Sequence, residues 1–150
     1  MVALSPPPLE HRWGSLSFVS TLYLCPILDC LLSNVPRRWR AELRLGLQEA
    51  LVNAVKHGNR LDPNKVIAVR YTAIAGKYWW VIADEGNGFD FTHRCQVPCI
   101  DERGYPDLGD CGRGLHILHQ IFDEVHWAND GRELHLCKQM SRWSRLPLVS

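Results

Sequence analysis

The sequence has little net charge and no long apolar run, and both absences narrow the function classes. The formal net charge is +1, and the basic residues scatter along the chain apart from a small group at residues 37–40. Nothing in this pattern favours direct binding to nucleic acid. The longest apolar stretch, Leu22 to Leu32, is interrupted by Pro26 and Asp29 and is too short to cross a bilayer. Residues 1–10 have no charged segment ahead of an apolar one, so we expect no signal peptide and a cytoplasmic protein.

Paired cysteine motifs are also missing. The chain has six cysteines, but no two of them form a C-x-x-C pair. In a reducing compartment we therefore expect free thiols and not disulfides. Cys95, Cys99 and Cys111 fall in one loop-like region, which leaves zinc binding or redox sensing open, although their spacing fits no common zinc motif.

The familiar signatures of two large nucleotide-binding classes are absent as well. The chain contains neither the Walker sequence G-x-x-x-x-G-K-[ST] nor the H-R-D set of protein kinases. At 150 residues, of which 46% are hydrophobic, it is long enough to bury one globular core. We expect a flexible arm over residues 1–12, a single domain over 13–140 and a tail over 141–150.

Hydrophobic periodicity and turn residues predict the order of the elements. We expect a strand at Trp13–Val19, a helix from Ser20 or Thr21 to about Ser33, a long helix from about Arg38 to His57, strands at Val66–Ala73 and Tyr78–Ala83 joined at Gly76, a long loop at Asp84–Gly112, a helix from Gly114 to about Phe122, and strands at Val125–Ala128 and Leu134–Lys138 joined at residues 129–131. This order is not a strict alternation of strands and helices. It predicts a two-layer α/β (α+β) sandwich, with a mixed, mostly antiparallel sheet and about three helices on one face.

The long helix carries a carboxylate and an amide on one face, because Glu49 and Asn53 are one turn apart. At about 100° per residue the helix has two stripes. The apolar stripe, which we expect to face the sheet, contains Leu43, Leu47, Leu51 and Ala54, and the opposite stripe contains Glu42, Gly46, Glu49, Asn53 and Lys56. Taken alone, the second stripe is typical of a solvent-exposed face. A glycine inside a helix costs about 1 kcal/mol relative to alanine, so Gly46 indicates a close approach by another group.

Three segments occur in an informative order. They are Glu49-x-x-x-Asn53-Ala-x-x-His57-Gly58, then Asp84-x-Gly86-x-Gly88-Phe89, then Gly112-Arg113-Gly114-Leu115. Together they resemble the three nucleotide boxes of the Bergerat-fold (GHKL, histidine kinase-like) ATPase superfamily. The short length and the residues around the boxes are most similar to the anti-sigma regulatory serine kinases of bacterial partner-switching systems, and the resemblance covers about Ser15 to Met140.

The resemblance implies an ATP-dependent anti-sigma factor that binds a sigma factor and phosphorylates a STAS-type anti-anti-sigma protein on serine. It implies that Asn53 coordinates Mg²⁺ through its side-chain oxygen, a ligand type that suits this cation. It also implies that Glu49 is the catalytic base that receives the proton of the attacking hydroxyl.

The remaining boxes would hold the nucleotide. Asp84 would accept a hydrogen bond from the adenine amino group, beside a glycine loop that contains Gly86, Gly88 and Phe89. Gly112, Arg113, Gly114 and Leu115 would end a lid over the triphosphate, with the following helix N-terminus facing the phosphates. Lys56 and His57 would add contacts, although a salt bridge at the helix end explains Lys56 equally well.

Two other functions stay open. One is a non-catalytic, nucleotide-gated module that sequesters a partner protein. The other is a fragment of a sensor histidine kinase, which would require phosphoacceptor helices upstream, and the few residues before Ser15 leave no room for them. The sequence departs from the family at Gly131-Arg132-Glu133, where Gly-Thr is usual, and in the cysteine- and proline-rich stretch Cys95–Gly109. An apolar surface near the first strand and helix leaves a homodimer open, and we expect no membrane partner.

Overall fold

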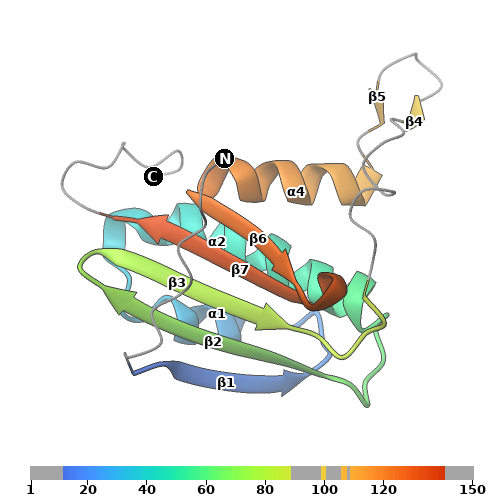
Figure 1. The fold of residues 1–150 in the computed structure, drawn as a ribbon, viewed down its shortest axis with the longest axis horizontal. Helices are drawn as coiled ribbons and strands as arrows, with labels where there is room; N and C mark the ends of the chain where they lie inside the picture. Colours follow the sequence, from blue (N-terminus) through green and yellow to red (C-terminus); the bar gives the residue numbers. More distant parts are fainter. Residues whose placement is uncertain (1–11, 89–98, 101–105, 108, 141–150) are drawn as a thin grey trace.

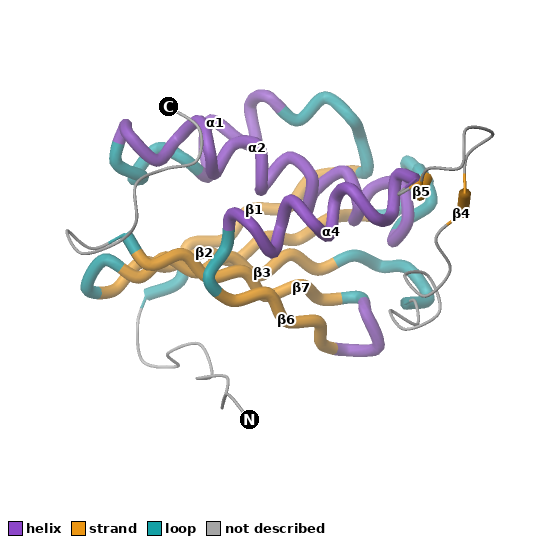
Figure 2. Tube along the Cα trace, turned by 90° about the horizontal axis from the view of Figure 1, so that it is seen from above, coloured by secondary structure: helices purple, strands orange, loops and turns teal. Residues whose placement is uncertain are grey.

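The fold is a single antiparallel sheet with helices on one face (Figure 1). A computed structural model describes residues 12–88, 99–100, 106–107 and 109–140. Within these residues the sheet has five strands in the order β1-β2-β3-β7-β6. Figure 2 shows helices α1, α2 and α4 together on one side of the strands. The predicted two-layer α/β fold is therefore confirmed. In the described ranges no helix has the length and apolarity needed to cross a membrane.

The sheet is fully antiparallel among its described strands. The strands are β1 (Gly14–Val19), β2 (Val66–Ile74), β3 (Lys77–Ala83), β6 (Glu124–Ala128) and β7 (Glu133–Gln139). The central pair, β3 and β7, runs in register from Lys77 opposite Gln139 to Ala83 opposite Glu133. Two short strands, β4 (Cys99–Ile100) and β5 (Pro106–Asp107), form a separate antiparallel pair inside the segment predicted to be a loop.

Helix α1 (Cys25–Leu31) begins later than the sequence predicts, with Pro26 in its first turn. Ser20 and Thr21, where the sequence predicts the start of this helix, make other contacts. The Thr21 hydroxyl oxygen accepts the Tyr23 N–H at 3.1 Å, and the Ser20 hydroxyl donates to the Lys65 carbonyl oxygen at 3.1 Å. Both side chains therefore stabilise the connection between β1 and α1, so the predicted helix start was wrong.

Helix α2 (Arg37–Asn53) continues directly into a π-helical turn, η1 (Ala54–Gly58). The Asn59 N–H donates to the Ala54 carbonyl oxygen at 2.8 Å, which is the hydrogen bond that closes this wider turn. Single π-turns of this kind occur often at functional sites. Together α2 and η1 account for the predicted long helix.

One prediction for α2 was half right. Leu43, Leu47 and Leu51 are fully buried, as expected for the sheet-facing stripe. Glu42 and Gly46, however, are not on a solvent-exposed face: Glu42 is 0% exposed, and a Cβ on Gly46 would lie 2.7 Å from the Phe122 ring. The helical-wheel prediction assumes that α2 packs on the sheet alone. In the structure α4 also packs along a second side of α2.

Helix α4 (Gly109–Ile121) begins before the predicted start at Gly114. Glycines disfavour a helix interior, and for that reason the sequence alone predicts a later start. The helical backbone nevertheless includes Gly112 and Gly114, and at Gly114 the packing on α2 requires a small residue. The predicted turn between β6 and β7 is confirmed as the short 3-10 helix η2 (Asn129–Gly131), in which all three residues have positive φ.

Candidate functional site

A small pocket lies between α2 and the adjoining ends of β3, β6 and β7. The end of α2 and the start of η1 form one wall, and sheet residues form the other. Its lining residues are Ala50, Asn53, Ala54, Ile82, Asp84, Trp127, Arg132 and Leu134. The fold therefore brings Asn53 and Asp84, which belong to different sequence boxes, to the same cavity.

Asp84 is held firmly at the end of β3. Its backbone N–H donates to the Arg132 carbonyl oxygen at 2.9 Å, and its Oδ1 accepts the Gly86 N–H at 2.8 Å. Burial raises the pKa of the Asp84 carboxyl, while the Gly86 N–H and the charges of Arg132 and Lys65 act in the opposite direction. The result is an oriented hydrogen-bond acceptor at one end of the pocket.

The glycines around Asp84 are needed because neighbouring groups of the same chain leave no room for a Cβ atom. A Cβ on Gly58 would overlap the Asp84 carboxylate, and a Cβ on Gly86 would overlap the Gly58 carbonyl oxygen. Gly88 has a φ of +78°, and a Cβ there would overlap the Asp130 carbonyl oxygen. The glycine loop is thus fixed between η1 and the β6–β7 turn. The resemblance implies that this loop also lies beside the adenine base, and that contact stays a prediction.

Asn59 is a positioning residue that sequence reasoning missed. It is 0% exposed, and its Nδ2 donates to the Ser20 hydroxyl oxygen at 2.8 Å and to the Val66 carbonyl oxygen at 3.0 Å. Its Oδ1 accepts the Glu85 N–H at 2.7 Å. One side chain therefore connects β1, β2 and the loop that carries Asp84. In the sequence an asparagine after Gly58 indicates only the end of a helix.

Glu49 and Asn53 face the first half of α4. A Cβ built on Gly114 would lie 3.3 Å from Glu49 Oε2 and 3.3 Å from Asn53 Nδ2. Both side chains are half-buried. The absence of a side chain at Gly114 lets α4 approach a carboxylate and an amide closely, and this donor set fits Mg²⁺ shared with phosphate oxygens.

The other predicted site residues have different positions. Lys56 is exposed and His57 is half-buried, and both lie on η1 outside the residues that line the pocket. Leu115 packs against the hydrophobic core. Gly112 and Arg113 lie in α4.

Several predictions fall wholly or partly outside the described residues. Phe89, Cys95 and most of the predicted loop lie there, so the question of zinc or redox chemistry at the loop cysteines stays untested. Cys25, Cys30 and Cys137 are free thiols, as expected. The described part of the chain contains no group of three His, Cys, Asp or Glu side chains arranged to hold a metal ion.

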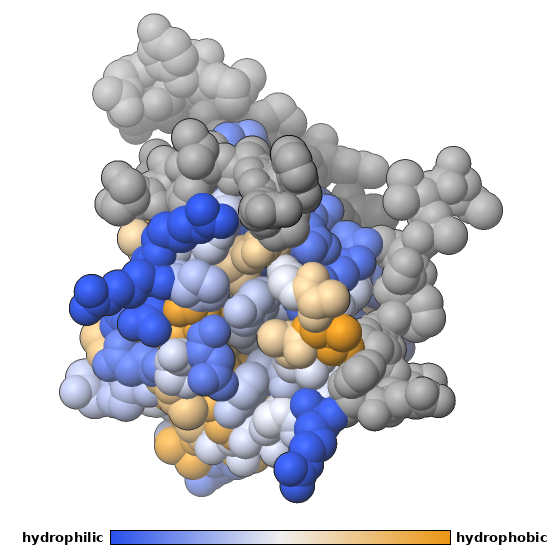
Figure 3. All heavy atoms as spheres, turned by 90° about the vertical axis from the view of Figure 1, so that its left-hand side faces the viewer, coloured by the Kyte–Doolittle hydropathy of each residue, from blue (hydrophilic) through white to orange (hydrophobic). Residues whose placement is uncertain are grey.

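A larger cavity, of about 370 Å³, lies at the opposite end of the sheet. Tyr71, Tyr78 and Trp80 line it, and among the described lining residues only Arg12 is charged. Figure 3 views this end of the molecule and shows hydrophobic residues as separate patches among hydrophilic ones. Although it is larger, this cavity has neither a carboxylate nor a boxed residue among the described residues that line it. The pocket with Asn53 and Asp84 is therefore the candidate functional site.

Comparisons with known proteins show the family to which the chain belongs. A family model described as the histidine kinase-like ATPase domain matches residues 26–138. The serine-protein kinase RsbW of Bacillus subtilis (strain 168) is 30% identical over 90 residues, which cover 59% of this chain and 56% of that protein. The RsbW of Bacillus licheniformis (strain ATCC 14580) is 31% identical over 105 residues, covering 67% and 65%.

The anti-sigma F factor of Geobacillus kaustophilus is 27% identical over 104 residues, which cover 67% of this chain and 70% of that protein. The matched region spans less than two thirds of the length of both RsbW proteins. The family model, in contrast, covers most of this chain, from residue 26 to residue 138. The chain therefore belongs to the histidine kinase-like ATPase domain family.

Proposed function

We propose that this protein is an ATP-dependent anti-sigma factor and serine kinase, which binds a sigma factor and phosphorylates a STAS-type anti-anti-sigma protein. Membership of the ATPase family implies ATP binding. The observation that carries the proposal is the meeting of Asn53 and Asp84 in one pocket, with Glu49 one turn from Asn53. The printed names of the relatives, serine-protein kinase and anti-sigma F factor, support the class of activity.

Asp84 would select the base. Its carboxylate accepts hydrogen bonds, so it favours the amino group of adenine over the carbonyl oxygen of guanine. The hydrogen bond from Gly86 and the close packing on Gly58 orient this acceptor before ATP arrives. Ile82, Trp127 and Leu134 would contact the apolar surface of the base.

Asn53 would hold Mg²⁺ through its side-chain oxygen. When bound, the cation would neutralise negative charge on the triphosphate and hold it in position. Lys56 and His57 on η1, and the residues Gly112 to Leu115, remain the proposed phosphate contacts. Because α4 begins at Gly109, these four residues lie within the helix, whereas the resemblance implies a position at its N-terminus. Phe89, on the glycine loop, remains a proposed contact with the nucleotide.

Glu49 would act as the catalytic base. The serine oxygen of the substrate protein would form a bond to the γ-phosphorus of ATP, while the bond from that phosphorus to the β,γ-bridging oxygen breaks and ADP leaves. The proton of the serine hydroxyl would pass to the Glu49 carboxylate. The half-buried position of Glu49 beside Gly114, one turn from Asn53, supports this role.

Incubation with labelled ATP and a candidate STAS-type protein tests the proposal. The native protein should produce phosphoserine, and Glu49→Gln should lower the transfer rate by about 10²- to 10⁴-fold while ATP binding persists. Gln48→Ala, an exposed change at the neighbouring position of α2, serves as the control and should transfer normally. Absence of phosphoserine from the native protein, or full activity of Glu49→Gln, would exclude the kinase function.

The non-catalytic, nucleotide-gated module is the alternative function. It predicts tight ATP binding, ATP-dependent capture of a partner and no phosphoryl transfer to any protein. A pull-down from the cell of origin, with and without ATP, distinguishes the two, because a kinase should release its phosphorylated antagonist.

A homodimer remains part of the proposal. Val19, Leu22 and Tyr23, in and after the end of β1, are 59%, 52% and 72% exposed. Grouped exposed apolar side chains are typical of protein-contact surfaces. Sedimentation of the native protein and of Tyr23→Ser should reveal a dimer that the substitution weakens, whereas a concentration-independent monomer would contradict it.

A further inference from the structure

Arg132 occupies the base end of the nucleotide pocket, at a position where this chain departs from the family. The resembling family usually has Gly-Thr at this turn, whereas this chain has Gly131-Arg132. Arg132 lines the pocket together with Asp84, and its carbonyl oxygen accepts the Asp84 N–H at 2.9 Å. A backbone hydrogen bond therefore joins Arg132 to Asp84, the residue proposed to select the base. A positive side chain at this point calls for a functional explanation.

The turn before Arg132 holds its side chain in a defined position. Arg132 Nε donates to the Asn129 carbonyl oxygen at 3.1 Å, and a guanidinium Nη2 lies 3.8 Å from Asp130 Oδ2. A guanidinium has five N–H donors, more than these two contacts require. N–H donors therefore remain available to a ligand. The Arg132 side chain lies at the rim of the pocket and is 46% exposed.

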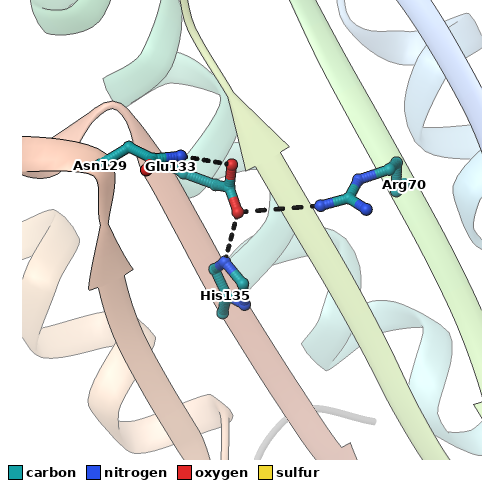
Figure 4. Close-up of polar contacts among 4 residues, drawn as sticks. All are labelled: Arg70, Asn129, Glu133 and His135. Carbon is teal, nitrogen blue, oxygen red and sulfur yellow. Dashed lines mark hydrogen bonds and ion pairs between the residues drawn. The ribbon is translucent and has the colours of Figure 1, made fainter. Parts of the chain in front are cut away.

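A polar cluster on the helix-free face of the sheet supports the turn (Figure 4). Glu133 Oε2 accepts Asn129 Nδ2 at 3.0 Å, while its Oε1 lies 2.6 Å from His135 Nε2 and 3.8 Å from Arg70 Nη2. The chain of contacts thus runs from β2 and β7 through Glu133 to Asn129, and from the Asn129 carbonyl to Arg132. It pre-organises the guanidinium and lowers the conformational entropy that binding would cost.

We propose that Arg132 is a specificity-determining residue that donates a hydrogen bond to adenine N1. This atom lies beside the adenine amino group, which donates its own hydrogen bond to Asp84. The inference rests on the proposed ATP site and adds a second contact to it. On its Watson–Crick edge adenine presents a donor, the N6 amino group, next to an acceptor, N1. Asp84 offers the matching acceptor and Arg132 the matching donor, so the two side chains together complement adenine.

The position of Arg132 favours the base over the phosphates. The proposed phosphate-binding groups, Asn53 and the start of α4, meet at Gly114. Arg132, in contrast, is bonded through its backbone to Asp84, which is the acceptor for the base. A contact with the base predicts that nucleoside and nucleotide affinities change by the same factor, whereas a contact with phosphate predicts a change for the nucleotide alone.

Calorimetric titration with ATP, adenosine and 1-deazaadenosine tests the proposal. Arg132→Ala should weaken ATP and adenosine binding equally, by about tenfold, the size expected for loss of one hydrogen bond to a charged donor. The native protein should bind 1-deazaadenosine about tenfold more weakly than adenosine, and Arg132→Ala should bind both alike. Asn129→Gly keeps the left-handed turn but removes the Glu133 contact, so it should cause a smaller loss. Arg37→Ala, an exposed change at the far end of α2, should bind like the native protein.

Two results would overturn the inference while leaving the ATP site intact. One is native-like ATP binding by Arg132→Ala, and the other is a loss that affects ATP but not adenosine. The 1-deazaadenosine comparison on the native protein involves no substitution, so it remains decisive if a variant folds poorly, and equal binding of the two nucleosides would refute the N1 contact. If the native protein binds no ATP at all, the proposed function itself fails.

Discussion

Replacing Lys138 with methionine should destabilise the protein strongly, because Lys138 forms an ion pair inside the core. Lys138 Nζ lies 3.4 Å from Glu42 Oε1, and the two side chains are 1% and 0% exposed. The same Nζ donates to the Ile121 carbonyl oxygen at 2.7 Å and lies 4.9 Å from the centre of the Trp39 ring. One ammonium group thus connects β7, the end of α4 and α2.

The expected cost follows from what the substitution leaves behind. At 3.4 Å and an effective dielectric constant of about 20, the gross attraction between the two charges is about 5 kcal/mol. Lys138→Met would remove one charge of this buried pair and leave the other buried, which typically costs about 3–5 kcal/mol in the free energy of unfolding. For a domain of this size each kcal/mol shifts Tm by about 2–4 °C, so Tm should fall by about 6–20 °C.

Equilibrium unfolding in urea, followed by far-ultraviolet circular dichroism, measures this cost. The double variant Glu42→Met with Lys138→Met should recover most of the loss, since replacing both members of a buried pair by apolar residues is often close to neutral. The matched control is the exposed pair Arg44–Asp29, which is closer at 2.7 Å but has side chains 38% and 69% exposed. Arg44→Met should cost at most about 1 kcal/mol. Additive effects of the two core substitutions, or a cost for Lys138→Met no larger than for Arg44→Met, would refute the reasoning.

Three further predictions concern the pocket and the thiols. Gly58→Ala should abolish ATP binding and lower Tm, because its Cβ would overlap the Asp84 carboxylate; normal nucleotide titration of this variant would contradict the close packing. Asp84→Asn should weaken ATP binding yet raise the Tm of the nucleotide-free protein at neutral pH. Burial raises the pKa of Asp84 above the ordinary value of 3.8. Above the raised pKa the buried carboxylate is ionised, and its ionisation lowers the free energy of unfolding. This loss of stability disappears as the pH falls from the raised pKa to 3.8. The Tm advantage of Asp84→Asn should therefore shrink in acid, and a pH-independent difference would argue against it. Burial raises the pKa of the Cys137 thiol to about 12, so alkylation at about pH 8, mapped by mass spectrometry, should modify the exposed Cys25 and Cys30 and spare Cys137 unless the protein unfolds.

Local patterns predicted the strands well. Val66–Ala73 and Tyr78–Ala83 differ by one residue at one end from β2 and β3, because β-branched and aromatic residues mark strands directly. Asn53 and Asp84 were identified from short motifs, and the fold brings them to one pocket. In each case the signal lies within a few neighbouring residues.

The failures share a different cause, which is contact between residues far apart in the chain. The burial of Glu42 depends on Lys138, 96 residues later. Asn59 connects to Ser20, 39 residues earlier, and Arg132 reaches Asp84 only because β3 and β7 are neighbours. No local pattern encodes such pairings, although the glycine inside α2 did indicate that some group approaches there.

The place of β7 in the sheet has a consequence for how the chain folds as it is synthesised. This strand lies between β3 and β6, yet it follows every other described strand in sequence. While the ribosome is still making Glu133–Gln139, the β1-β2-β3 part of the sheet can form, but β3 remains an open edge that carries Trp79, Trp80, Val81 and Ile82. Such unpaired apolar edges are prone to aggregation. The nascent protein should therefore depend on chaperones most strongly just before β7 emerges, and truncation ahead of Glu133 should yield insoluble material.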